Sequence, residues 1–203
     1  MHRHVLLALA FALPLAAQKP APPKAPDVPA EVPPQIQTLQ PGVKLTLLAE
    51  HPDLVTPTGI SVDAQGRIYL AACHTHFRPE GYPGPEHDEI LTFDADGKNR
   101  RVFYRQTTAT MHVECGPDGW VYLAERSRIL RVKDSDGDGT ADLAEDLATL
   151  DTLADYPHNG LSGMAWHPDG SLVISLGENF GKDWTLTARD GAKVSGRGEG
   201  GVF

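Results

Sequence analysis

Residues 158–181 read HNGLSGMAWHPDGSLVISLGENFG. Apolar and small polar residues alternate over 171–176, which predicts a β-strand with one buried face. A shorter strand is predicted over 163–166, and the Pro-Asp-Gly sequence at 168–170 supplies the turn that joins the two. The stretch therefore predicts a β-hairpin.

The same hairpin pattern occurs twice earlier in the chain. Residues 57–71, PTGISVDAQGRIYLA, and residues 111–124, MHVECGPDGWVYLA, each place two apolar runs around a glycine-containing turn. The turn glycines Gly66, Gly119 and Gly170 recur at intervals of about 50 residues, a period typical of β-propeller blades. The repeat predicts an all-β propeller.

Each repeat is predicted to hold four strands. The third repeat begins at Gly160 and stops within the blade at 201–203, where an apolar strand has only begun. The predicted strands are 59–63, 67–72, 89–93 and 101–104 in the first repeat, and 112–116, 120–125 and 128–133 in the second. We therefore expect blades over about 43–106 and 107–155, an incomplete blade over 156–203, and a truncated chain.

The first 41 residues show no pattern of a folded core. Residues 1–17 combine a short basic start, an apolar run and two alanines, which predicts a secretory signal peptide; the apolar run is much shorter than the roughly 20 residues of a membrane anchor. Residues 18–41 contain eight prolines and predict an extended, disordered linker. We expect a periplasmic or extracellular protein without a stable membrane span after signal cleavage.

Charge and cysteine content narrow the functional classes. The net charge is −9 and the 18 lysines and arginines are dispersed, which argues against a nucleic-acid partner. The two cysteines, Cys73 and Cys115, belong to no CxxC or CxxCH motif, so neither a zinc ribbon nor an attached haem is indicated. A disulfide and two buried thiols both remain open.

An acidic loop at 134–145, DSDGDGTADLAE, matches the calcium-binding loop of EF-hands. The predicted ligands are Asp134, Asp136, Asp138, Thr140 through its carbonyl, Asp142 and Glu145, with Gly139 at the sharp turn. The preceding residues read as a strand, so this would be a structural calcium site inside a blade, joined to the segment 141–150. The alternative is a solvated, metal-free Asp/Gly turn.

The histidines provide candidates for catalysis. His158 precedes the first strand of the third repeat and Glu178 follows the second, so both are expected at the same rim, where the carboxylate can orient the imidazole as a general base. The alternative is a histidine that only caps a turn. His112 aligns with Gly59 and Gly163, and no chemistry is assigned to it.

A second histidine cluster lies in the long loop 73–88. Its histidine and glutamate side chains are possible zinc ligands, so a zinc site in this loop is a further hypothesis. These residues are His74, His76, Glu80, Glu86 and His87.

Two groups of residues carry a family resemblance over about 43–203. The run from His158 to Gly170 with Leu176-Gly177-Glu178 resembles the soluble glucose/sorbosone dehydrogenases, which are six-bladed propellers. Pro57-Thr-Gly59, Asp63-x-x-Gly66-Arg-Ile-Tyr69 and the run from Arg131 to Asp142 are most similar to exported membrane-bound dehydrogenase-like proteins of planctomycetes and verrucomicrobia. The resemblance implies the N-terminal two and a half to three blades of a six-bladed propeller.

The resemblance also implies a reaction. In that family the matching histidine takes the substrate hydroxyl proton as hydride passes to pyrroloquinoline quinone, so His158 would be the base and Glu178 its orienting partner. The family pattern has an aspartate in this loop, whereas this chain has Glu178, one residue further along. The residues that hold the quinone in the family would lie beyond Phe203. The implied function is oxidation of a sugar or alcohol. The alternatives are a non-catalytic, calcium-stabilised propeller that binds a glycan or protein, and a lactonase-type hydrolase with a channel metal.

Overall fold

The computed structural model describes residues 39–43, 45, 47–76, 78–155 and 159–203. The chain divides into two units, Met1–Leu45 and Thr46–Phe203, and all the strands described below belong to the second unit. The predicted signal peptide, 1–17, lies outside the described residues, as does nearly all of the predicted linker, 18–41. In the described part of the chain, no helix is long and apolar enough to cross a membrane.

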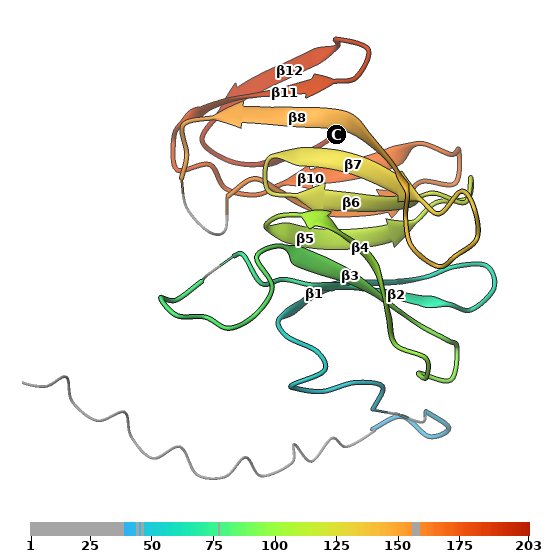
Figure 1. Ribbon diagram of the computed structural model, residues 1–203. Coiled ribbons are helices and arrows are strands. Elements are labelled where there is room, and N and C mark those ends of the chain that lie inside the picture. The colour runs from blue at the N-terminus through green and yellow to red at the C-terminus, as the bar shows by residue number, and fades with distance from the viewer. Residues whose placement is uncertain (1–38, 44, 46, 77, 156–158) are drawn as a thin grey trace, which may run out of the picture. The chain divides into compact units, whose positions relative to one another are not determined.

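The first sheet of the second unit is a four-stranded antiparallel meander that corresponds to the first predicted blade (Figure 1). Its strands are β1 (Pro57–Val62), β2 (Ile68–Ala72), β3 (Asp88–Phe93) and β4 (Arg101–Thr107). All residues of β2 and β3 are buried, because these two strands lie in the centre of the sheet and are covered on both faces.

The second sheet has six strands in the order β12-β11-β8-β7-β6-β5. The strands are β5 (Thr110–Cys115), β6 (Val121–Glu125), β7 (Arg128–Lys133), β8 (Leu143–Thr152), β11 (Asp183–Ala188) and β12 (Lys193–Arg197). The first three confirm the predicted strands of the second repeat. The β11–β12 hairpin was not predicted: it pairs with the second half of β8 and extends the second sheet instead of the third.

The third sheet has three strands in the order β13-β10-β9. These are β9 (Leu161–Trp166), β10 (Leu172–Leu176) and β13 (Gly201–Val202). The strand that begins at Gly201 is therefore the third strand of this sheet, and it pairs with the end of β10.

The three hairpin turns confirm the sequence repeat. Gly66, Gly119 and Gly170 have φ values of 85°, 77° and 90°, in the left-handed region that glycine adopts without steric cost. Each glycine donates its N–H to the carbonyl three residues earlier, at Asp63, Gly116 and His167 respectively. The glycine at each repeat is thus required by the turn that reverses the chain.

Successive sheets pack against one another through their first strands, with β1 against β5 and β5 against β9. One buried core lies between the first and second sheets and includes Tyr69, Phe103 and Leu123. A second core joins the second and third sheets. This is the arrangement expected of neighbouring blades, and the fold is all-β and of propeller type.

Side chains of the neighbouring sheets cap the open edge of β5. The hydroxyl of Ser61 accepts from the N–H of Cys115 at 3.0 Å, and the indole Nε1 of Trp166 donates to the Cys115 carbonyl at 3.1 Å. Thr58 Oγ1 donates to the Thr110 carbonyl at 2.7 Å. The edge strand therefore has partners for backbone groups that would otherwise be available for wrong pairing.

Gly59 is the closest point between the first two sheets, and we predict that Gly59→Ala is destabilising. A Cβ at this position would lie 2.8 Å from Val113 N and 2.9 Å from His112 Cα, and both are backbone atoms that cannot rotate away. Forcing the sheets apart should cost about 1–3 kcal/mol in the free energy of unfolding, measured by urea denaturation. The matched control is Ile60→Ala, the exposed neighbour on the same strand. Equal stability of Gly59→Ala and wild type would contradict the close packing.

Candidate functional site at the loop rim

The antiparallel order divides the connections between two edges of the sheets. One edge, here called the loop rim, carries the connections 73–87, 108–109, 126–127, 153–160, 177–182 and 198–200. The opposite edge, here called the turn rim, carries the three hairpin turns, the acidic loop between β7 and β8, and the turns 94–100 and 189–192. Glu178 therefore lies on the loop rim, and the predicted calcium ligands lie at the other edge.

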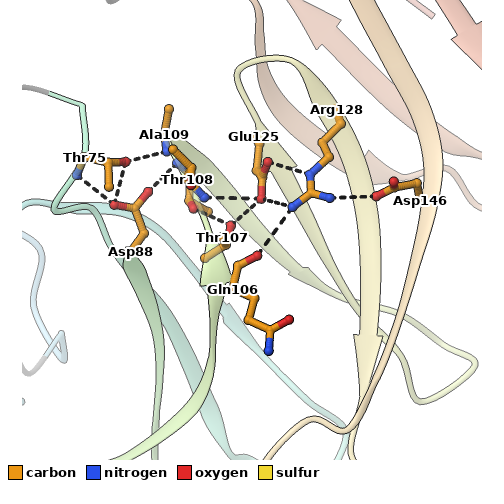
Figure 2. Close-up of polar contacts among 10 residues, drawn as sticks. Thr75, Asp88, Gln106, Thr107, Thr108, Ala109, Glu125, Arg128 and Asp146 are labelled. Carbon is orange, nitrogen blue, oxygen red and sulfur yellow. Dashed lines mark hydrogen bonds and ion pairs between the residues drawn. The ribbon is translucent and has the colours of Figure 1, made fainter. Parts of the chain in front are cut away.

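Asp88 holds the start of the long loop 73–87 against the second sheet (Figure 2). Its side chain is fully buried. Oδ1 accepts from the N–H groups of His74 at 2.6 Å and Thr75 at 2.8 Å, and from the Thr75 hydroxyl at 2.9 Å. Oδ2 accepts from the N–H of Thr110 at 2.7 Å. A buried carboxylate is tolerated when it is hydrogen-bonded in this way.

Glu125 is another buried carboxylate of the loop rim (Figure 2). Oε1 accepts from the Thr107 hydroxyl at 2.8 Å, and Oε2 accepts from Arg128 Nε at 2.6 Å. Arg128 also donates to Asp146 at 3.1 Å. The hydrogen bond from Arg128 to Glu125 raises the pKa of the guanidinium, which remains charged.

Backbone hydrogen bonds continue this network across all three sheets. Ala109 N–H donates to Thr75 Oγ1 at 2.6 Å, Arg126 N–H donates to the Ala109 carbonyl at 3.1 Å, and Leu161 N–H donates to the Arg126 carbonyl at 2.9 Å. A Cβ at Gly160 would lie 2.2 Å from the Arg126 carbonyl oxygen, so glycine is needed there. These contacts fix the described residues around Thr75, Ala109, Arg126 and Leu161 relative to one another.

His158, the predicted base, lies outside the described residues. Its predicted partner Glu178 is exposed, on the loop after β10. The following residue, Asn179, is fully buried, and its Oδ1 accepts from Asn159 Nδ2 at 3.4 Å. Gly177 N–H donates to the Gly160 carbonyl at 2.8 Å. The segments 159–160 and 177–179 therefore meet at the loop rim.

The acidic loop gathers three of its six predicted ligands. Asp134, Asp136 and Asp138 each offer a carboxylate oxygen within 4.8 Å of the others, and these three form the one such group of His, Cys, Asp or Glu found among the described residues. Partial burial acts to raise the pKa of Asp134, but hydrogen bonds from the amides of Gly139 and Gly137 outweigh it and lower the pKa. The arrangement offers a hard cation a partial shell of oxygen ligands.

The remaining side-chain ligands are turned to other partners. Asp142 accepts from the N–H and hydroxyl of Ser135 at 2.7 and 2.5 Å, and this lowers its pKa. Glu145 lies on β8 opposite Arg131 and accepts from Arg131 at 2.8 Å and Arg189 at 2.6 Å, which lowers its pKa. The loop pattern missed this pairing because β8 begins at Leu143, before the twelfth loop position.

Thr140 was predicted to provide its backbone carbonyl. In the structure its N–H donates to Asp138 Oδ1 at 2.7 Å, so this residue stabilises the turn next to the aspartates. The loop connects two strands, which confirms that it is not part of a helix-loop-helix.

The histidine cluster of loop 73–87 does not assemble a metal-ligand group in its described part. His74 instead places Nδ1 2.7 Å from the Tyr82 hydroxyl. His112 lies on β5, with Nε2 3.6 Å from the Glu114 carboxylate.

The two cysteines are free thiols. Burial raises the pKa of both, and that of Cys115 reaches about 11. Neither thiol is therefore activated as a nucleophile.

Comparison with solved structures shows similarity in fold. The gluconolactonase XC5397 from Xanthomonas campestris is 16% identical over 76% of this chain and 51% of that chain, with a TM-score of 0.51. A luciferin-regenerating enzyme is 12% identical over 72% and 48%, with a TM-score of 0.49. The PQQ domain of pyranose dehydrogenase from Coprinopsis cinerea is 15% identical over 68% and 34%, with a TM-score of 0.47.

The chain spans about half of the length of the first two of these structures. No curated protein matches the sequence. A family model described as a domain of unknown function, DUF7133, matches residues 32–199, which is most of the chain. The chain therefore belongs to the DUF7133 family.

Proposed function

We propose that this chain is part of an exported, six-bladed propeller oxidoreductase that oxidises a sugar or alcohol, with His158 as general base and Glu178 as its orienting partner. The observation that carries the proposal is the meeting of segments 159–160 and 177–179, through the Asn159–Asn179 and Gly160–Gly177 hydrogen bonds. The residues adjoining the predicted base and the predicted carboxylate are thus held at one rim. An imidazole oriented by a carboxylate can accept the hydroxyl proton of an alcohol at neutral pH.

Residues of this chain would take up the hydroxyl proton and hold the base in position. His158 would accept the hydroxyl proton, and Glu178 would hold the imidazole in the required tautomer. Pyrroloquinoline quinone, when bound, would supply the acceptor for the two electrons.

We further propose that the acidic loop binds structural calcium at the turn rim. The converging carboxylates of Asp134, Asp136 and Asp138 support this role, because three charges so close repel one another unless a cation or solvent screens them. The present contacts of Glu145 with Arg131 and Arg189 stabilise the adjoining strands, so Glu145 need not complete the metal shell. Water would complete it.

Replacement of the base tests the proposed oxidation. In the full-length protein supplied with pyrroloquinoline quinone and calcium, His158→Ala should lower the rate of dye reduction with sugars by about 10²–10⁴-fold. The control is His167→Ala, an exposed histidine at the turn rim. Both variants should retain the melting temperature of the wild type.

Three outcomes would contradict the assigned base. A full rate in His158→Ala excludes it directly. An active wild type that hydrolyses lactones without reducing the dye would favour the lactonase alternative. A folded wild type with no turnover that binds a glycan or protein would favour the non-catalytic propeller.

Calcium binding is tested by neutralising the acidic loop. At a calcium concentration 100 times its Kd, the ion should add about 2.7 kcal/mol to the stability of the wild type, and chelation should remove this gain. Asp136→Asn with Asp138→Asn should abolish the gain. The calcium-free double variant should be at least as stable as the calcium-free wild type, because two repelling charges are gone.

A second acidic turn provides the control for the calcium experiment. The pKa of Asp134 determines the pH at which the experiment is done. Asp94→Asn with Asp96→Asn, in the turn between β3 and β4, should leave the calcium effect unchanged. The pKa of Asp134 is lowered in the folded state, so its contribution to stability is present at pH 7 and is lost only as the pH falls below about 4. Calorimetry at pH 7 that detects no calcium binding would contradict the site.

A further inference from the structure

A cavity of about 390 Å³ opens beside the first sheet at the loop rim. Its lining comes from the segment before β1, the end of β2, the long loop 73–87, the start of β3 and the residue that precedes β4. The polar side chains in this lining belong to His51, Asp53, His74, Tyr82, Glu89 and Arg100. Most of the other lining residues are apolar or proline, including Val55 and Ala72. Cavities of this size, with apolar walls and a few polar groups, are typical of small-molecule sites.

The Tyr82 side chain is held in position on the wall of the cavity. The guanidinium of Arg78 lies 5.0 Å from the centre of the Tyr82 ring and donates to the carbonyls of Gly84, at 2.9 Å, and Pro85. A Cβ at Gly84 would lie 2.3 Å from the Tyr82 ring, so glycine lets the loop pass it. The tyrosine hydroxyl in turn lies 2.7 Å from His74 Nδ1.

His74 and Glu89 are both tied to the buried Asp88, His74 by a hydrogen bond and Glu89 as the next residue in the chain. The backbone N–H of His74 donates to Asp88 at 2.6 Å, and the His74 side chain belongs to a residue only 8% exposed. Glu89 is also 8% exposed and accepts from Arg105 Nε at 3.1 Å. The His74, Tyr82 and Glu89 side chains of the cavity are therefore held in position before any ligand arrives.

Arg100 closes the cavity on the side of the segment before β1. Its Nε donates to the Asp53 carbonyl at 3.0 Å, and its Nη2 lies 3.8 Å from the Glu89 carboxylate. The lining thus presents a guanidinium, two carboxylates and a histidine–tyrosine pair, which together offer both hydrogen-bond donors and acceptors.

The mixture of charges selects a class of ligand. An anion such as phosphate would face the carboxylates of Glu89 and Asp53, and an organic cation would face the guanidinium of Arg100. Hydroxyl groups both donate and accept, so they can pair with either kind of group without a net charge. The C–H face of a sugar ring also suits the apolar wall and the Tyr82 ring.

We propose that this cavity binds a neutral polyhydroxylated ligand, a monosaccharide or a small polyol. The site draws its lining from residues 51–100 and includes no residue from the third sheet. It is therefore independent of the proposed oxidation at His158 and would hold a sugar even in a protein without turnover.

A nuclear magnetic resonance titration with D-glucose tests this site and locates it. The titration uses the full-length His158→Ala protein, so that sugar turnover does not interfere. Saturable amide shifts are expected within residues 72–89, with a Kd on the order of 1 mM. Tyr82→Ala and Arg100→Met, each added to this background, should weaken binding at least tenfold. Tyr82→Phe, which keeps the ring but loses the hydroxyl to His74, should weaken it less.

The control is Arg197→Met, which removes an exposed guanidinium from β12 and should leave binding unchanged. Each variant is first checked for the wild-type melting temperature, and Tyr82→Phe serves as the least disruptive probe. Absence of glucose binding, shifts confined to residues 159–182, or tighter binding of inorganic phosphate than of glucose would each overturn the inference. Loss of catalysis in His158→Ala with glucose binding retained in this cavity would support both proposals separately.

Discussion

Burial of the Asp88 and Glu125 carboxylates is the constraint on which the arrangement of the loop rim depends. An ionised carboxylate out of contact with water is costly unless hydrogen bonds and charges around it replace the lost hydration. Asp88 meets this requirement with donors from the long loop and from β5, and Glu125 meets it with Thr107 and Arg128 (Figure 2). The donors come from neighbouring sheets, so the loops cannot move apart without leaving a buried charge unpaired.

The two edges of the sheets are thereby suited to different tasks. The loop rim holds the segments that adjoin His158 and Glu178, and it also holds the cavity beside Tyr82. The turn rim holds short glycine turns and the acidic loop. Asp134 lies at the far end of the strands from Glu178. A cation bound at the turn rim would therefore act on the stability of the second sheet and not on the segments around Glu178.

The local architecture could be predicted from the sequence because each hairpin is specified within about 15 residues. Alternating apolar residues and a turn glycine are local signals, and they placed the strands around Gly66, Gly119 and Gly170 correctly. The β11–β12 hairpin was missed because it pairs with β8. Trp184 of β11 pairs with Thr152 of β8, which lies more than 30 residues earlier in the chain. No local pattern specifies which sheet such a hairpin joins.

The candidate sites were predictable to a smaller extent, for the same reason. The spacing of Asp134, Asp136 and Asp138 is local, and the structure brings these carboxylates together. Glu145 is directed to Arg131 by strand pairing, and His74 is directed to Tyr82 by a loop whose path depends on Arg78 and Asp88. The buried role of Asp88 had no signal in the sequence, because it depends on donors from two sheets.

The most direct test of this account is hydrogen–deuterium exchange on Asp88→Asn compared with the wild type. The asparagine amide keeps the shape of the side chain but presents N–H groups to donors that require an acceptor. The account predicts a loss of about 3 kcal/mol in unfolding free energy, with faster exchange at His74, Thr75 and Thr110 than at the turn rim. Unchanged stability and unchanged protection at these three amides would contradict it.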